Sequence, residues 1–115
     1  MREDVYHTKL VKRLDHTFPG CIIVRLDPRF VDFYIDGERY SQGVLDILVL
    51  YRGRVAALEL KRARTAAKQA NQEYFVQQFG DVCFAAFIFP ENEEEVLNDL
   101  QQAFSSRRPA RASQR

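Results

Sequence analysis

The chain has 115 residues, of which 46% are hydrophobic, and a formal net charge of +1. These values suit one globular domain with a real core, and the small net charge means that binding to nucleic acid depends on how the charges are distributed. No apolar run is long enough to span a membrane, the first residues are too polar for a secretory signal, and two cysteines are too few for a zinc site.

The first segment, residues 2–18, predicts an amphipathic helix because its apolar side chains recur at helical spacing. Pro19-Gly20 ends this helix. Glu3 lies at the edge of the core-facing side, where it is either an acid favourably placed in a first helical turn or a further member of an acidic site. His7, one turn later, is more simply explained as a partly buried core histidine than as a catalytic base.

Two strands are predicted next. Residues 21–26 (CIIVRL) form the first strand, and residues 30–35 (FVDFYI) form a second and more exposed one. Asp36-Gly37 is a turn signal. The polar residues 38–43 (ERYSQG) are typical of a loop.

The stretch 44–61 (VLDILVLYRGRVAALELK) predicts a buried β-hairpin. Its two apolar runs, residues 44–51 and 55–60, have the length and the Val, Ile and Leu content of buried strands. Arg52-Gly53 supplies a two-residue turn, because glycine fits the positive φ that such a turn needs.

The register of this hairpin brings two acids together. If Arg52-Gly53 is the whole loop, Asp46 falls directly opposite Glu59, and Lys61 lies on the same face as Glu59. Opposed residues have Cβ atoms roughly 4.5–5.5 Å apart, so two carboxylates repel each other there. A divalent cation such as Mg²⁺ between them reverses that effect, and the Lys61 ammonium beside it could orient a water or neutralise a phosphate.

Several polar residues flank the hairpin. Arg62, Arg64 and Lys68 follow it within seven residues, and such a run is either a solvated face or a set of cations for a polyanionic backbone. Ser41 and Gly43 precede it, where a loop could approach a phosphodiester. Gly43 is explained equally well as a plain turn glycine or by close backbone approach.

The remaining elements complete the domain. Residues 66–79 predict a helix that carries Gln69 and Gln72, with Tyr74 among its inward-facing side chains. Residues 82–89 (VCFAAFIF) predict a third buried strand in a central position of the sheet. The order of elements predicts a sheet flanked by helices on both sides, with this strand parallel to the strand of Glu59.

The C-terminal segment divides into a helix and a tail. Residues 91–104 predict a closing helix that begins at Asn92 as N-cap. The three glutamates 93–95 crowd the positive end of its dipole, which indicates a structural role. Residues 105–115, with four arginines and no acid, predict a disordered basic tail with some affinity for nucleic acid.

Asp46 followed by Glu59-Leu60-Lys61 resembles the D…(D/E)-x-K signature of the PD-(D/E)xK nuclease superfamily. Within it the chain is most similar to the VRR-NUC group, whose Gly-x-Pro-Asp motif corresponds to Gly43-Val44-Leu45-Asp46, with Leu45 where proline is usual. The resemblance spans roughly residues 3–104. It implies a single VRR-NUC-like domain over residues 1–104, with a restriction-endonuclease-like α/β core in which α-helices flank a central mixed β-sheet.

The resemblance also implies roles for these residues. Asp46 and Glu59 would hold Mg²⁺ or Mn²⁺, joined by the backbone carbonyl of Leu60 and by Glu3, since the group carries a glutamate in its first helix. Lys61 would position or activate the attacking water. The group carries a glutamine before an aromatic residue in the next helix, which Gln72 fits best and Gln69 fits as the alternate.

These residues lead to the hypothesis of a metal-dependent endodeoxyribonuclease that hydrolyses DNA phosphodiester bonds in a structure-selective way, as a Holliday-junction resolvase does. The alternatives are a nuclease that acts on flap or linear duplex DNA, a non-catalytic nucleic-acid-binding module of the same fold, and an unrelated α/β domain with a structural acid pair. We expect a homodimer in the cytoplasm of a bacterium or phage-infected cell. The aromatic-rich segment Phe30–Tyr40 is the candidate dimer contact, although ordinary half-buried strand aromatics explain it equally well.

Overall fold

The structure is a computed structural model, and it describes residues 2–27, 29–40, 45–63 and 70–106 of the chain. In chain order the elements are α1 (Glu3–Thr17), β1 (Ile22–Arg25), β2 (Phe33–Ile35), β3 (Glu38–Tyr40), β4 (Ile47–Tyr51), β5 (Arg54–Leu60), α2 (Ala70–Gly80), β6 (Phe84–Ile88) and α3 (Glu93–Ser105). Five of the candidate site residues lie outside the described residues, as does the basic tail from residue 107: Ser41, Gly43, Arg64, Lys68 and Gln69.

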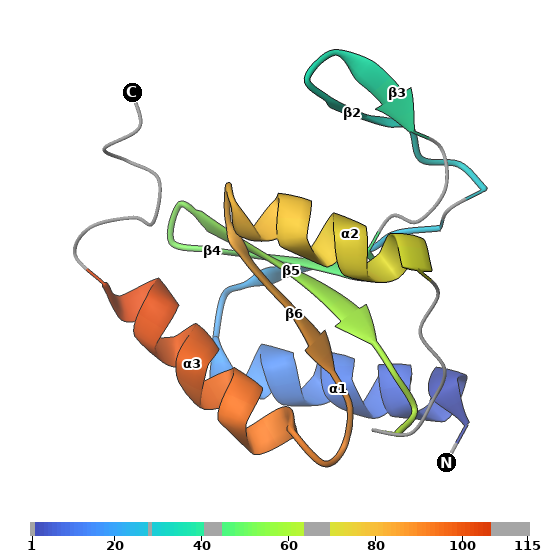
Figure 1. Ribbon diagram of the computed structural model, residues 1–115. Helices are drawn as coiled ribbons and strands as arrows, with labels where there is room; N and C mark the ends of the chain where they lie inside the picture. Colours follow the sequence, from blue (N-terminus) through green and yellow to red (C-terminus); the bar gives the residue numbers. More distant parts are fainter. Residues whose placement is uncertain (1, 28, 41–44, 64–69, 107–115) are drawn as a thin grey trace.

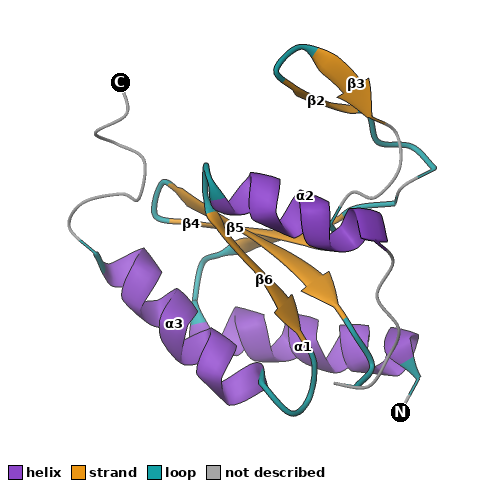
Figure 2. Cartoon of the chain, viewed as in Figure 1, coloured by secondary structure: helices purple, strands orange, loops and turns teal. Residues whose placement is uncertain are grey.

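Four strands form a mixed sheet in the order β1-β4-β5-β6. The strand β4 pairs antiparallel with both β1 and β5, whereas β6 runs parallel to β5. A parallel pair needs a long crossover, and α2 lies within the connection from β5 to β6 (Figure 2). The predicted mixed sheet and the predicted parallel orientation of β6 are both confirmed.

Helices cover both faces of this sheet (Figure 1). On one face α1 and α3 pack against it, and Leu10, Leu100 and Leu58 are fully buried there. On the other face α2 contributes Phe75, which packs with Ala57. Because Ala57 and Leu58 are neighbours in β5, their side chains point to opposite faces, and each face has a core of its own.

The central hairpin has the register that the sequence predicts. Tyr51 pairs with Arg54 and Ile47 pairs with Leu58. Arg52 and Gly53 both have positive φ, at 51° and 78°. Two consecutive residues of this kind make the type of turn whose twist matches a two-residue hairpin.

The turn of a second hairpin is predicted by the sequence, but its second strand is not. Asp36-Gly37 forms its turn, with φ of 52° and 81°. The residues that follow pair antiparallel with β2 as the strand β3, so the loop predicted over residues 38–43 is wrong for residues 38–40. The side chains of β3 are exposed or half-buried, and for that reason the strand lacks the apolar alternation that marks a strand in a sequence.

Aromatic rings attach this second hairpin to α2. Phe33 and Tyr40 stack with ring centroids 5.7 Å apart, and the Phe75 ring lies 5.2 Å from Phe33 and 5.4 Å from Tyr40. Phe75 is therefore the inward-facing aromatic of this turn of α2. The inward orientation predicted for Tyr74 is wrong, because 43% of its surface is exposed.

The strand β6 is an edge strand, which corrects the central position predicted for it. Its apolar character has another origin. Phe84 and Ala86 pack into the core under α1 and α3, while Ala85 packs into the core under α2. Burial on both faces requires apolar side chains whether or not a strand has neighbours on both edges.

The helix α3 begins after Asn92, but the Asn92 side chain does not cap it. Instead its Oδ1 accepts a 2.9 Å hydrogen bond from the Phe89 N–H, and its Nδ2 donates to the Phe87 carbonyl at 3.1 Å. Asn92 is therefore the N-cap residue of α3, as predicted, but its side chain makes no capping hydrogen bond. Asn92 stabilises the turn from β6 into α3.

The acidic start of α3 binds α1. The Tyr6 hydroxyl donates a 2.9 Å hydrogen bond to Glu93, and Arg13 forms ion pairs with Glu93 and, at 2.7 Å, with Glu94. The structural role predicted for these two glutamates is confirmed. Of the helices in the described ranges, none is long and apolar enough to cross a membrane.

Candidate active site

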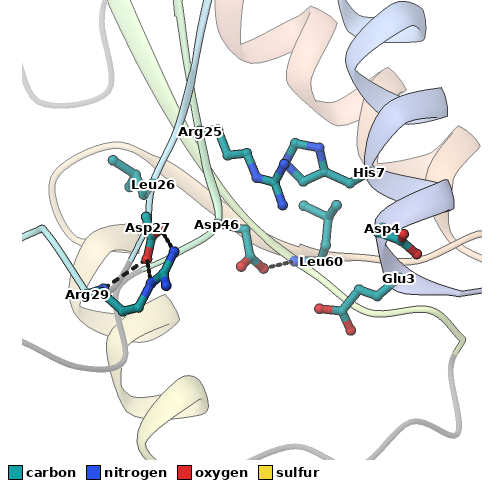
Figure 3. A pocket seen from close by; sticks show the side chains of 9 residues that line it. All are labelled: Glu3, Asp4, His7, Arg25, Leu26, Asp27, Arg29, Asp46 and Leu60. Atoms are coloured by element: carbon teal, nitrogen blue, oxygen red, sulfur yellow. Dashed lines mark hydrogen bonds and ion pairs between the residues drawn. The ribbon is translucent and has the colours of Figure 1, made fainter.

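The candidate site lies where β4 begins and β5 ends. The Asp46 N–H donates a 3.0 Å hydrogen bond to the Leu58 carbonyl, and this bond extends the hairpin by one residue beyond β4. The Asp46 Oδ2 atom accepts a 2.7 Å hydrogen bond from the Leu60 N–H (Figure 3). Asp46 raises the pKa of the Glu59 carboxyl, so the two carboxyl groups lie close together. The two acids therefore meet as the register predicts.

Glu59 is almost completely buried, with 3% of its surface exposed. Burial raises the pKa of its carboxyl far above the ordinary value, and the hydrogen bond and negative charge of Asp46 raise it further. At neutral pH the Glu59 carboxyl therefore keeps its proton in the metal-free protein. Among the described residues, no hydrogen-bond partner reaches the buried Oε2 of Glu59.

Lys61 is also buried, with 5% of its surface exposed. Its Nζ donates a 2.8 Å hydrogen bond to the Oε1 of Gln72, and the same nitrogen lies 5.9 Å from the centre of the Phe87 ring. Lys61 follows β5, whereas Gln72 is in the first turn of α2. The structure thus brings the predicted glutamine to the predicted lysine from a separate element.

Glu3, at the start of α1, faces the acid pair. Partial burial raises the pKa of its carboxyl and the charge of Asp46 adds to the rise, while Lys61 and Arg62 oppose it. Mutual electrostatic influence of this kind requires these side chains to be near one another. Arg62 is exposed, so it lies at the surface beside the acids.

His7 lies one turn after Glu3 and faces the same site (Figure 3). Burial lowers the pKa of its imidazole, the positive charge of Arg25 lowers it further, and Asp46 partly opposes both effects. Its Nε2 is buried without a hydrogen-bond partner in the part of the chain that the structure describes. The predicted partial burial of His7 is confirmed, but its side chain lines the pocket beside the acids and is not part of the hydrophobic core.

The site residues fit the divalent cation that the family resemblance implies. Asp46 and Glu59 offer hard carboxylate oxygens, and one oxygen of Glu59 is buried without a partner. Within the described ranges no group of three or more His, Cys, Asp and Glu side chains could hold an ion, so Glu3 does not complete a third side-chain ligand in this conformation. Mg²⁺ accepts this composition, because it is usually held by one or two carboxylates together with waters and phosphate oxygens.

A pocket of about 620 Å³ opens beside the acid pair. Its lining consists of Glu3, Asp4, His7, Arg25, Leu26, Asp27, Arg29, Asp46 and Leu60 (Figure 3). The sequence analysis did not assign Arg25, Asp27 or Arg29 to the site. A signal for Arg25 was present, because it interrupts an apolar strand just as Asp46 interrupts an apolar run at the start of β4.

Comparisons of the chain with protein-family models, with curated proteins and with solved structures gave no match.

Proposed function

We propose that the chain is a metal-dependent endodeoxyribonuclease of the PD-(D/E)xK superfamily, similar to the VRR-NUC group. The observation that carries this proposal is the arrangement of Asp46 and Glu59. Their carboxyl groups meet at the end of a hairpin, one oxygen of Glu59 is buried without a partner, and Lys61 follows two residues later in the sequence. A like-charge pair of this kind is destabilising unless a proton or a metal ion lies between its members.

In the proposed mechanism each site residue has a separate role. Bound Mg²⁺ or Mn²⁺, held by Asp46, Glu59 and the Leu60 carbonyl, would lower the pKa of a coordinated water and neutralise charge on the scissile phosphate. Lys61 orients the attacking water and stabilises negative charge on the phosphate oxygens. Gln72 positions Lys61 through the 2.8 Å hydrogen bond. Glu3 lies near Asp46 and would add negative charge beside the bound ion.

The residues proposed to contact DNA lie in the segments on either side of the central hairpin. Arg62 is exposed beside Glu3 and can bind the phosphate backbone. Arg64, Lys68, Ser41 and Gly43 are proposed for the same role on the basis of the sequence alone. Phosphate contacts set affinity and its salt dependence but not sequence preference, so selectivity has to come from the shape of the DNA.

We also propose that the protein acts as a homodimer on four-way junctions. Of the four aromatic residues in the predicted contact, Phe33 and Tyr40 pack inward against α2, so they are not available to a partner. Tyr34 remains 64% exposed and Val82 67% exposed on a shared pocket of about 480 Å³. These two apolar side chains are the proposed centre of a two-fold contact.

The experiment that tests the proposed function is a cleavage panel with Mg²⁺ and with Mn²⁺ on linear duplex, flap, splayed and four-way-junction DNA. Paired nicks in the junction, together with a dimer in light scattering, would support the whole proposal. Cleavage of flap or linear duplex by a monomer would contradict the proposed substrate and the proposed dimer. It would still support the proposal that the protein is a nuclease. Binding to DNA with no cleavage under either metal would favour the non-catalytic binding module.

A further inference from the structure

Phe30 is the most exposed large apolar side chain in the part of the chain that the structure describes, with 81% of its surface accessible. A single exposed apolar residue needs no explanation by itself. The position of Phe30 does need one, because it lies in the short loop after β1 that also supplies Asp27 and Arg29 to the pocket beside the acid pair.

Phe30 does not line that pocket itself, but its ring contacts Arg29, which does. The Arg29 guanidinium stacks on the ring at 5.3 Å from its centre and lines the pocket itself. Arg29 is fixed in turn by Asp27, which accepts hydrogen bonds from its Nε at 3.1 Å, its Nη2 at 2.8 Å and its backbone N–H at 3.0 Å. The Phe30 N–H donates to the Asp27 carbonyl at 2.9 Å.

The same loop is connected to the acid pair. The Leu26 N–H donates a 2.8 Å hydrogen bond to the backbone carbonyl of Asp46. Leu26 immediately precedes Asp27, so a short run of backbone and side-chain hydrogen bonds leads from Asp46 to Phe30. The ring therefore has a defined position relative to the carboxylates.

Besides its acids, the pocket contains two arginines that can bind a phosphate, Arg25 and Arg29. Burial lowers the pKa of the His7 imidazole, and the positive charge of Arg25 lowers it further. Hydrogen bonds from Arg29 lower the pKa of the Asp27 carboxyl, and Arg25 adds to that shift as well, so its guanidinium lies near both groups. None of the ion pairs found among the described residues involves Arg25. A phosphate that entered the pocket would meet this guanidinium, and the base attached to the neighbouring sugar would lie near the exposed face of Phe30.

We infer that Phe30 is a stacking platform for a nucleobase whose face is exposed, beside the site of cleavage. Aromatic side chains bind bases in this way without regard to sequence, since every base has a π-face. This inference rests on the proposed nuclease function and names its substrate class. The preferred DNA has an unpaired base, or the exposed end of a base-paired arm, next to the cut. Covalently closed circular duplex offers neither, because it has no ends and its bases are stacked on one another.

Tryptophan fluorescence tests the inference directly. The natural chain contains no tryptophan, so Phe30→Trp introduces a single emitting residue at the proposed platform. Ile22→Trp is the matched control, because Ile22 is 63% exposed but lies at the other end of β1 from Arg25. Each variant is titrated with single-stranded DNA, splayed DNA and covalently closed circular duplex, in buffer with EDTA and in buffer with Ca²⁺.

We expect the emission of Phe30→Trp to be quenched by single-stranded and splayed DNA but not by closed duplex. The emission of Ile22→Trp should be unchanged by all three. In parallel, Phe30→Ala should weaken affinity for splayed DNA by about 5- to 150-fold, the range that corresponds to loss of one base–aromatic stack. Its melting temperature should equal that of the wild type, since the side chain is exposed.

Binding of splayed DNA without quenching of Phe30→Trp would overturn the inference. So would a blue shift of its emission that depends on protein concentration in the absence of DNA, because Phe30 would then be a contact between two copies of the chain. If DNA quenches Phe30→Trp but the wild-type protein cleaves no DNA, the inference that Phe30 binds a base stands and the proposed nuclease activity is wrong. If the wild type binds none of the three DNAs, both proposals are wrong.

Discussion

The ammonium of Lys61 donates a hydrogen bond of 2.8 Å to the side-chain oxygen of Gln72. This contact joins the end of β5 to the first turn of α2, two elements that the sequence separates by a run of basic residues. The contact orients the buried ammonium of Lys61, which follows Glu59 by two residues. Both α2 and the central hairpin therefore contribute to the proposed site.

This contact predicts that Lys61 and Gln72 act as a unit. Lys61→Ala should lower single-turnover cleavage by about 10²–10³-fold, as does loss of one preorganised electrostatic donor in other enzymes. Gln72→Ala should lower it by about 10–100-fold, the range for a group that orients a site residue. The double variant should be no slower than Lys61→Ala alone, because Gln72 has no lysine left to position. Fully additive losses would show that Gln72 acts independently.

The raised pKa of Glu59 predicts how stability depends on pH in the metal-free protein. The unfolded carboxyl ionises near its ordinary value, while the folded one keeps its proton to a much higher pH. Glu59 therefore contributes stability that is fully present below the unfolded pKa and is lost as pH rises toward the folded pKa. Glu59→Gln should remove this loss, so its melting temperature should exceed that of the wild type increasingly from pH 5 to pH 8. Equal melting curves at pH 8 would contradict the buried acid pair.

The proton held by Glu59 also predicts that metal binding is linked to protonation. A divalent cation between Asp46 and Glu59 must displace that proton, so Mn²⁺ affinity should rise with pH across the neutral range. Calorimetric titration in two buffers that differ in ionisation enthalpy should report about one proton released per bound ion. Glu59→Gln has no carboxyl proton to release at this position, so proton release should disappear in this variant. If the release persists, the proton comes from another group.

The exposed position of Arg62 predicts a role in binding rather than chemistry. Arg62→Ala should weaken DNA affinity and reduce the slope of log K against log salt by about 0.9 if Arg62 contacts one phosphate of duplex DNA. Lys12→Ala, with the same change of charge on the exposed surface of α1, is the matched control and should leave the slope unchanged. An unchanged slope in Arg62→Ala would remove this residue from the DNA interface.

The central part of the fold could be predicted because local and long-range signals agree there. Arg52-Gly53 permits only a tight turn, and apolar strands on both sides of it fix one register, which places Asp46 against Glu59. The contact of Lys61 with Gln72 depends on where α2 lies over the sheet, and this position is a tertiary property. A resemblance to known nucleases supplied that glutamine, whereas periodicity alone did not.

Other parts of the site and fold have no such local signal. The strand β3 is short, polar and largely exposed, so nothing in its sequence distinguishes it from a loop. Arg25, Asp27 and Arg29 join the pocket because β1 lies beside β4 in the sheet, and this pairing of strands cannot be derived from residues 21–29. The edge position of β6 could not be predicted from its composition. Apolar side chains indicate that both faces of a strand are buried, but they do not indicate whether it has a neighbouring strand on each side.

The most direct test of the account is cleavage of four-way-junction DNA by the wild-type protein and by Asp46→Asn, each freed of metal and then supplied with Mg²⁺ or Mn²⁺. The substitution keeps nearly the same side-chain shape but removes the negative charge that meets Glu59, and circular dichroism would check that the variant is folded. We predict metal-dependent nicking by the wild type, no nicking in EDTA, and only background nicking by the folded variant. Equal rates for the two proteins, or wild-type cleavage that persists in EDTA, would contradict the claim that Asp46 and Glu59 form a metal-dependent nuclease site.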